Sequence, residues 1–192
     1  MSPAATLTAG EAERAVLDAS DRLFYERGIA GVGMTEVRDA AGVSLRRLYA
    51  LHPSKRDLVA AWLDDRHARW TGWFVATLDR RSEKGVDPLL APFDALEEWA
   101  TSPGYRGCAF LNAIAETTEI DDGHRGIVAR HKILLTELLA TRARESGRVE
   151  PWLPEAIAVL VDGAIVRSAA LRSTEPIAAA RIAAATMLAG LS

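Results

Sequence analysis

The sequence has little cysteine, no long apolar run and no basic excess, and each shortage excludes a class of protein. Cys108 is the one cysteine of the 192 residues, so the chain can form neither an intrachain disulfide nor a cysteine-rich zinc site. Nowhere do about 18 apolar residues follow one another without a charge, and the N-terminal segment lacks the basic and apolar stretches of a signal peptide. We therefore expect a cytoplasmic protein that does not interact with a membrane.

The charge balance limits how the chain could bind nucleic acid. The formal net charge is -3 at pH 7. Proteins that bind nucleic acid along their whole surface usually carry a strong basic excess. Any contact with nucleic acid must therefore be local.

The signatures of catalytic, metal and cofactor sites are also missing. The glycine-rich segment 28–33 follows a helical stretch and has neither the spacing of a dinucleotide fingerprint nor the lysine of a phosphate loop, so we interpret it as a turn. His124 and His131 lie two helical turns apart and would need ligands from elsewhere to share one metal ion. The sequence predicts no catalytic residue, no metal site and no cofactor, and we expect the chain not to be an enzyme.

Apolar residues recur at helical spacing in nearly every segment, and glycine and proline fall between the segments. No stretch alternates apolar and polar residues for long enough to predict a strand. Thr8 and Ser54 each stand three positions before an acidic residue, which is typical of a helix start, and Thr35 and Ser44 suit the same capping role. The pattern predicts an all-α fold with helices at about residues 8–28, 35–41, 44–51, 54–81, 87–103, 108–117, 123–147, 154–173 and 175–191.

The two short helices at 35–41 and 44–51 carry the most informative pattern. Small residues from Ala40 to Val43 would let two helices cross at a steep angle around a glycine turn, which is a helix-turn-helix pattern. In the second helix Leu48 is expected to face the core and Leu45 can do so as well, while the polar side chains remain available to solvent or DNA.

Positive charge is concentrated at this second helix. Four cations and no carboxylate lie between residues 44 and 56. Arginine can bind guanine edges or phosphate, a tyrosine hydroxyl can bind phosphate, and the N–H groups at the helix start near Ser54 suit a phosphate oxygen. The alternative is a solvated basic turn. The predicted DNA-binding residues are Thr35, Arg38, Ser44, Leu45, Arg46, Arg47, Tyr49 and Lys55.

The order of these residues resembles the DNA-binding head of the TetR family of transcriptional regulators. The family pattern has a threonine-capped helix, Ala-Gly-Val-Ser, Leu-Tyr, and Ser-Lys before a leucine. This sequence matches it with Thr35, residues 41–44, 48–49 and 54–55, and Leu58. The resemblance covers about residues 10–60, and Arg38 and His52 depart from it.

The resemblance implies a subunit of about nine helices, with a helix-turn-helix domain at residues 1–54 and a helical ligand-binding and dimerisation domain at 55–192. It also implies a homodimer on a palindromic double-stranded DNA operator, usually a repressor that a small-molecule effector releases. The competing hypothesis is an all-α ligand-binding or enzymatic protein that merely contains a similar helical turn.

Large aromatic rings are concentrated in the predicted central helices, as expected for an apolar ligand cavity with a few polar groups. Most rings at helical spacing are nevertheless ordinary core, and a lone cysteine in an apolar helix is more often a small buried hydrophobe than a sensor. The predicted ligand-binding residues are Trp70, Trp73, Phe74, Trp99, Tyr105, Cys108, Phe110, Asn112, Glu116 and His131.

The last two predicted helices combine alanine with large aliphatic residues, which allows close helix packing. We expect a homodimer through these helices, with a four-helix interface. The alternative is that the same faces pack only inside one subunit. The apolar area is expected from Ile157, Leu160, Ile165, Leu171, Ile177, Leu188 and Leu191, and the close approach from Ala164, Ala169, Ala170, Ala178, Ala180 and Ala184.

Two longer helices carry further expectations. The helix at 54–81 would connect the predicted phosphate contact to Trp70 and Trp73, so that ligand and operator oppose each other. In the helix at 123–147 we expect the inward face to carry Ile127, His131, Leu134 and Leu138.

Overall fold

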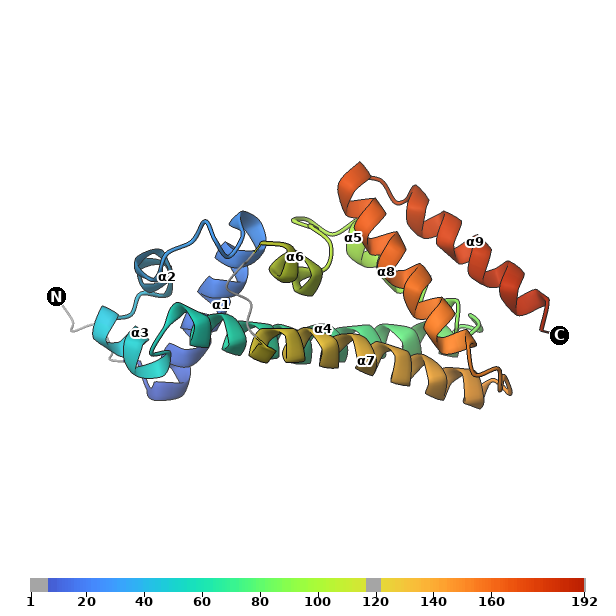
Figure 1. Cartoon of the computed structure of the whole chain (residues 1–192), viewed down its shortest axis with the longest axis horizontal. Helices are drawn as coiled ribbons and strands as arrows, with labels where there is room; N and C mark the ends of the chain where they lie inside the picture. Colours follow the sequence, from blue (N-terminus) through green and yellow to red (C-terminus); the bar gives the residue numbers. More distant parts are fainter. Residues whose placement is uncertain (1–6, 117–121, 192) are drawn as a thin grey trace. The chain divides into compact units, whose positions relative to one another are not determined.

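Every regular element in the described part of the chain is an α-helix. The computed structural model describes residues 7–116 and 122–191. Along these ranges the order is α1 (Ala9–Arg27), α2 (Met34–Ala41), α3 (Leu45–Leu51), α4 (Lys55–Glu83), α5 (Ala91–Ala100), α6 (Ala109–Glu116), α7 (Asp122–Glu145), α8 (Leu153–Leu171) and α9 (Glu175–Ala189) (Figure 1). The predicted all-α fold is confirmed. None of the described helices combines the length and apolarity that crossing a membrane requires.

Three predicted helix starts are confirmed by their capping bonds. Thr8 and Glu11 form a reciprocal capping box at α1, in which the Thr8 N–H donates to the Glu11 carboxylate at 2.8 Å. Ser44 Oγ accepts the Arg47 N–H at 3.2 Å at the start of α3. Ser54 Oγ likewise accepts the N–H three residues further on, at 3.1 Å, at the start of α4. These bonds satisfy backbone donors that the first turn of a helix leaves unpaired.

The predicted cap of α2 is wrong by two residues. Gly33 is the N-cap, because the carboxylate of Glu36 accepts the Gly33 N–H at 2.9 Å and Thr35 lies inside the first turn. The bond from Gly33, followed by the ion pair with Arg27, lowers the pKa of Glu36. The carboxylate therefore stays ionised and holds this end of the helix.

The start of α5 lies one turn later than predicted. The carboxylate of Asp87 accepts the Leu89 N–H at 2.9 Å, and its carbonyl oxygen accepts the N–H of Leu90 and Ala91. Asp87 thus closes a turn of its own, and the α-helix begins only at Ala91.

The buried face of α7 is rotated from the predicted one. His131 is buried as predicted, but it shares the buried face with Val128, Leu135 and Leu139. The residues that we expected there are only partly buried: Ile127, Leu134 and Leu138. Apolar residues occupy neighbouring positions all along this helix, so their spacing does not distinguish the two faces.

The contacts divide the chain into two compact units. Unit 1 contains the described residues up to His67 and those from Ala109 to Ile127, which include α1, α2, α3, the first part of α4 and α6. Unit 2 contains the residues from Ala68 to Cys108 and from Val128 onward, which include α5, α8 and α9. The functional boundary between residues 54 and 55 stays a prediction.

In unit 1, α1 packs on α2, and the fully buried Leu48 fixes the inner side of α3. Phe24 of α1 meets Trp62 of α4 edge-on, with ring centroids 5.3 Å apart. Asp21 accepts the Trp62 Nε1–H at 2.8 Å and forms an ion pair with Arg66. These contacts tie the beginning of α4 to the first helix.

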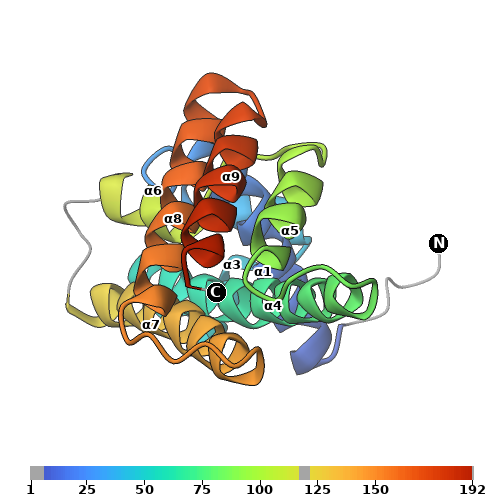
Figure 2. The same ribbon diagram turned by 90° about the vertical axis from the view of Figure 1, so that its right-hand side faces the viewer.

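In unit 2, α8 and α9 lie side by side as an antiparallel pair, and α5 packs against both (Figure 2). Four aliphatic residues expected at a dimer interface are buried in this packing, which makes that part of the prediction wrong: Ile157, Ile165, Ile177 and Leu188. Gly107, at φ +79°, lies so close to α8 that a Cβ atom there would be 2.9 Å from the Cβ of Ala169. The close approach of α8 to the segment before α6 therefore depends on glycine.

Candidate nucleic-acid interface and effector site

Helix α3 presents its polar side outward because a tight turn fixes its direction. Gly42 adopts the left-handed conformation at φ 66°, and the following Val43 N–H donates to the Arg38 carbonyl at 3.3 Å. This ends α2 and lets the chain enter α3 at Ser44. Leu48 is buried, whereas Leu45 and Tyr49 are 39% and 44% exposed. The expectation that Leu45 can face the core is wrong, and its side chain lies on the outer face.

Some cations of unit 1 are held in ion pairs and others are not. Four arginines are held by carboxylates: Arg14 by Asp65 at 2.6 Å, Arg27 by Glu36 at 2.8 Å, Arg38 by Asp39 at 2.6 Å and Arg66 by Asp21 at 2.5 Å. Within the described residues, Arg46, Arg47 and Lys55 belong to no ion pair. These cations of α3 and of the first turn of α4 can therefore meet an external anion without first breaking an internal pair.

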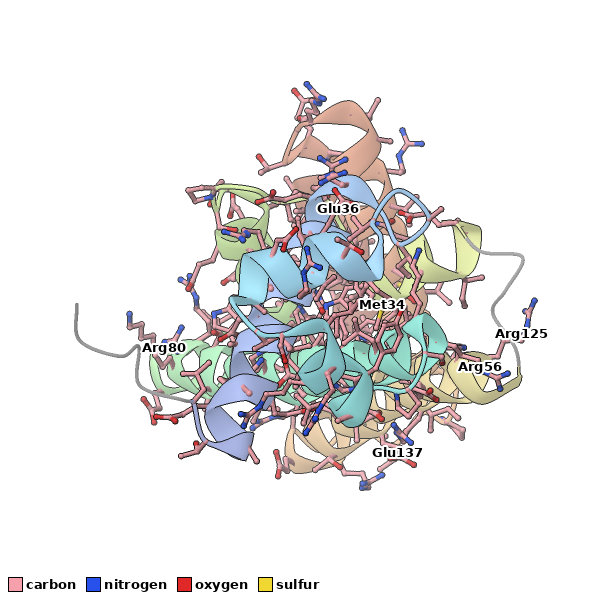
Figure 3. The ribbon with its side chains drawn as sticks, turned by 90° about the vertical axis from the view of Figure 1, so that its left-hand side faces the viewer. Met34, Glu36, Arg56, Arg80, Arg125 and Glu137 are labelled. Atoms are coloured by element: carbon pink, nitrogen blue, oxygen red, sulfur yellow. The ribbon has the colours of Figure 1, made fainter. Side chains whose placement is uncertain are left out.

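Other predicted DNA-binding residues lie on the neighbouring helix. Thr35 is exposed in the first turn of α2. Arg38 points its Nε and Nη2 at Asp39, at 2.8 and 2.6 Å, so a phosphate would have to compete with this carboxylate. Figure 3 views the molecule with α2 and α3 toward the reader and labels Met34 and Glu36 of α2.

His52 closes the other end of α3. Its backbone N–H donates to the Leu48 carbonyl at 2.8 Å, and its ring is 5% exposed. The Nε2 atom lies 3.3 Å from a carboxylate oxygen of Glu13 on α1. A buried imidazole thus occupies the position at which the sequence departs from the family pattern, and the end of the helix is intact.

Helix α6 contacts the turn after α1 through its last residue. The Glu116 carboxylate accepts the Ile29 N–H at 2.6 Å. It lies so close to Gly28, at φ +81°, that a Cβ atom there would be 2.5 Å from a carboxylate oxygen. Glu116 and Asn112 line a small pocket together with Phe24, Ile29 and Trp62. Phe110 meets His67 edge-on at 6.4 Å.

Unit 2 contains a cluster of aromatic rings, which we call the aromatic cluster. Its members are Trp70, Trp73 and Phe74 of α4, Trp99 of α5, Tyr105, and His131 of α7. Trp70 stacks on Phe74 at 4.5 Å and meets His131 edge-on at 5.1 Å and Trp99 at 6.0 Å. Trp99 meets Tyr105 edge-on at 5.0 Å. The cluster therefore joins three helices and the segment before α6 in one contact network.

Polar groups at the edge of the aromatic cluster are bonded to each other. The Tyr105 hydroxyl lies 2.7 Å from Ser168 Oγ and donates to the Ile165 carbonyl at 3.2 Å. Burial raises the pKa of Tyr105, so the phenol remains protonated. The buried Cys108 accepts a weak bond from Lys132 Nζ at 3.7 Å, and the same ammonium binds Asp162 at 2.6 Å.

Comparison with known proteins identifies the family. A model of the bacterial regulatory proteins of the tetR family matches residues 16–62. The HTH-type transcriptional regulator TtgR of Pseudomonas putida is 33% identical to this chain, over 80% of this chain and 87% of TtgR. The chain belongs to the TetR family. It is accordingly a DNA-binding transcriptional regulator with a helix-turn-helix.

Solved structures of TetR-family proteins share this fold. A TetR-family transcriptional regulator from Streptomyces coelicolor is 26% identical, with a TM-score of 0.80 over 95% of this chain and 97% of that one. The multidrug binding protein EbrR, complexed with malachite green, is 21% identical, with a TM-score of 0.70 over 90% of this chain and 95% of EbrR. The second similarity is one of fold alone.

Within this TetR-family subunit the predicted ligand-binding residues fall into two groups. Unit 2 holds seven of them: Trp70, Trp73, Phe74, Trp99, Tyr105, Cys108 and His131. Unit 1 holds Phe110, Asn112 and Glu116. Lys132, which contacts Cys108, was not predicted, because nothing in its spacing marks it as different from other helical lysines.

The two histidines considered as metal ligands have other neighbours. His124 Nε2 lies 3.1 Å from the Arg56 carbonyl oxygen, and His131 packs on Trp70. Among residues 7–116 and 122–191, no group of three potential metal ligands occurs. Asp121, an acidic residue three positions before His124 and a further candidate ligand, lies outside the described residues.

Proposed function

We propose that this TetR-family regulator is a repressor that binds a palindromic operator as a homodimer and releases it when a small, mainly apolar molecule binds in unit 2. The observation that carries the DNA-binding part is the geometry of α3. Its apolar Leu48 is fully buried, while Arg46 and Tyr49 are exposed. Within the described residues Arg46, Arg47 and Lys55 form no ion pair, although the charge of Lys55 contributes to the lowered pKa of Glu36.

At the operator, α3 enters the major groove and its arginines bind base edges or phosphates. Arg46 and Arg47 suit guanine edges because a guanidinium can donate two parallel hydrogen bonds. Tyr49 and Lys55 suit backbone phosphates, which fix the position of the helix without reading the sequence. Lys55 also lies in the first turn of α4, where unpaired N–H groups favour an anion.

A homodimer through α8 and α9 is supported by an exposed apolar stripe on each helix. On α8 the exposed positions follow helical spacing, and on α9 the exposed small residues surround one large aliphatic residue. The stripe, which we call the α8–α9 face, contains Val159, Gly163, Val166, Ala170, Ala179, Ile182 and Ala183. Val159 and Ile182 are 61% and 68% exposed, so they can supply apolar area to a second copy.

Gly163 is a specific argument for this dimer face. Glycine inside a helix costs about 1 kcal/mol relative to alanine. A Cβ atom at Gly163 would meet nothing within 4 Å, so no neighbour in the described chain requires the glycine. Close approach of a helix from a second copy would require it.

The effector part of the proposal is supported by the aromatic cluster. Large rings with few polar groups are typical of small-molecule sites. EbrR, which shares the fold, is a multidrug binding protein complexed with malachite green, a dye that contains aromatic rings. For Phe110, Asn112 and Glu116, which lie in unit 1, ligand binding stays a separate prediction.

Helix α4 offers a route from the effector to the operator. It is continuous from Lys55 to Glu83 and carries Trp70 and Trp73. At about 1.5 Å per residue, Trp70 lies roughly 22 Å along the helix from Lys55. A ligand that displaces the end of α4 that carries Trp70 and Trp73 would tilt the other end, beside α3. The two α3 helices of a dimer must enter successive major grooves about 34 Å apart, so a small change in their separation prevents both from binding together.

A gel-shift experiment with the DNA upstream of its own gene tests the proposal against the competing hypothesis. We expect a shifted complex at moderate salt that an unrelated duplex of equal length does not compete away. An all-α binding protein or enzyme that merely contains a similar turn would give no such complex.

A further inference from the structure

The aromatic cluster contains a hydrogen-bond donor that the described chain does not use. Trp70 Nε1 is buried and has no hydrogen-bond partner among the described residues. A buried indole N–H usually finds an acceptor, because an unpaired donor loses its bond to water without replacement. The rings around Trp70 belong to Trp73, Phe74, Trp99 and His131. Of these only the imidazole of His131 has an atom that can accept a hydrogen bond, a ring nitrogen, and it does not bond the Trp70 N–H.

We propose that the Trp70 N–H is the polar contact of the effector site, and that the effector is a planar aromatic molecule with a hydrogen-bond acceptor at its edge. This inference rests on the proposed effector response and adds its chemical class. The flat shape follows from the rings that would surround it, which favour stacked and edge-to-face contacts. The acceptor follows from the unsatisfied donor, because a ligand that pairs it recovers the lost hydrogen bond.

The other polar groups near the aromatic cluster do not compete for this acceptor. Tyr105 uses its hydroxyl on Ser168 and Ile165. Lys132 binds Asp162 at 2.6 Å. In this part of unit 2, two side-chain donors of the described residues are buried without a hydrogen-bond partner, the Trp70 N–H and the hydroxyl of the adjacent Thr71. Of the two, only Trp70 belongs to the aromatic cluster.

A cationic effector is the main alternative, since aromatic faces attract cations. A cation needs an open ring face and gains from a nearby carboxylate. One face of Trp70 is covered by Phe74, at 4.5 Å and an interplanar angle of 16°. The carboxylate of Asp162 is already neutralised by Lys132. Both observations favour the neutral acceptor over the cation.

Three probes of nearly the same shape separate these classes. Naphthalene has no acceptor, quinoline has a ring nitrogen acceptor and is uncharged at pH 8, and N-methylquinolinium is a cation without an acceptor. Their affinities are measured calorimetrically at pH 8 on the full chain and on two variants. Trp70→Phe keeps a ring and removes the N–H, and Trp152→Phe is the matched control at an exposed tryptophan outside the aromatic cluster.

We expect the wild-type chain to bind quinoline more tightly than naphthalene. The ratio of the two affinities should fall about tenfold in Trp70→Phe, a factor that corresponds to about 1.4 kcal/mol. The ratio should change little in Trp152→Phe. A ¹⁵N spectrum adds a direct readout, because the indole signal missing from Trp70→Phe should shift when quinoline is added to the wild-type chain. This spectral test holds even if the variant binds poorly or melts early.

Several results would overturn the inference. They are an unchanged quinoline-to-naphthalene ratio in Trp70→Phe, a stationary Trp70 indole signal, tightest binding by N-methylquinolinium, and no binding of any probe. The same preparation is tested for binding to its upstream DNA. If the wild-type chain binds this DNA but gives one of the results above, only the acceptor contact is rejected. If the wild-type chain does not bind this DNA, the proposed function is rejected.

Discussion

Replacing Glu116 by alanine removes the acceptor that the Ile29 N–H uses just after α1. The bond is 2.6 Å long and partly buried, and Ile29 itself is 4% exposed, so water can replace the carboxylate only in part. A donor left unpaired in such a place costs about 1–3 kcal/mol. Because Glu116 itself lies on the surface, we expect the lower part of this range, about 1–2 kcal/mol of unfolding free energy.

The assay is thermal unfolding followed by circular dichroism. For a chain of this size, each kcal/mol lowers Tm by about 2–4 °C, so Glu116→Ala should melt roughly 2–8 °C below the wild-type chain. Glu116→Gln keeps an amide oxygen as acceptor and should recover most of the loss. Glu137→Ala is the matched control, because Glu137 is an exposed glutamate whose side chain has no bond to the described residues. Its effect should stay within about 0.5 kcal/mol.

The reasoning would be refuted by equal melting of Glu116→Ala and Glu137→Ala. It would also fail if Glu116→Gln melted as early as the alanine variant, since the loss would then come from charge or packing and not from the acceptor.

Three further predictions concern the proposed function. Arg46→Ala should weaken operator binding by about 1–3 kcal/mol if the side chain reads a base. Lys55→Ala should weaken binding to all DNA sequences alike and reduce the slope of log affinity against log salt concentration by about one. Both effects are measured by fluorescence anisotropy at several salt concentrations. Gly163→Leu should convert the dimer to a monomer in light scattering and keep its helical circular-dichroism spectrum, while Gly126→Leu, at another helical glycine with open space, should stay dimeric. A dimeric Gly163→Leu would reject the α8–α9 face. Trp73→Ala should abolish release of DNA by a bound aromatic ligand and leave DNA binding without ligand nearly intact, so a normal response in this variant would exclude the role of α4.

Local chemistry made much of the fold predictable. The caps at Thr8, Ser44 and Ser54 depend on residues three positions apart, and such contacts form wherever the helix forms. The cap of α2 was missed because Gly33 has no side chain to suggest it, and the decisive group is the carboxylate of Glu36. Sequence reasoning favours a hydroxyl at a cap and overlooks a glycine whose N–H is bonded from inside the helix.

Contacts between distant segments were less predictable. That Leu45 lies outside and Leu48 inside follows from how α3 rests on unit 1, since either leucine could face the core by spacing alone. That Glu116 belongs to unit 1 and the aromatic cluster to unit 2 could not be read from the sequence either. Glu116 follows the aromatic residues Tyr105 and Phe110 closely along the chain, which suggests a common site. Only the fold reveals that its carboxylate accepts the Ile29 N–H.

The most direct test of the central claim is the affinity of the chain for its upstream operator duplex and for a scrambled duplex, with and without the double substitution Arg46→Ala and Arg47→Ala. If α3 reads the operator, the wild-type chain should prefer the operator by at least about a thousandfold. The double variant should lose most of that preference and retain its Tm. Equal wild-type affinity for the two duplexes, or a preference that survives the double substitution, would contradict the account.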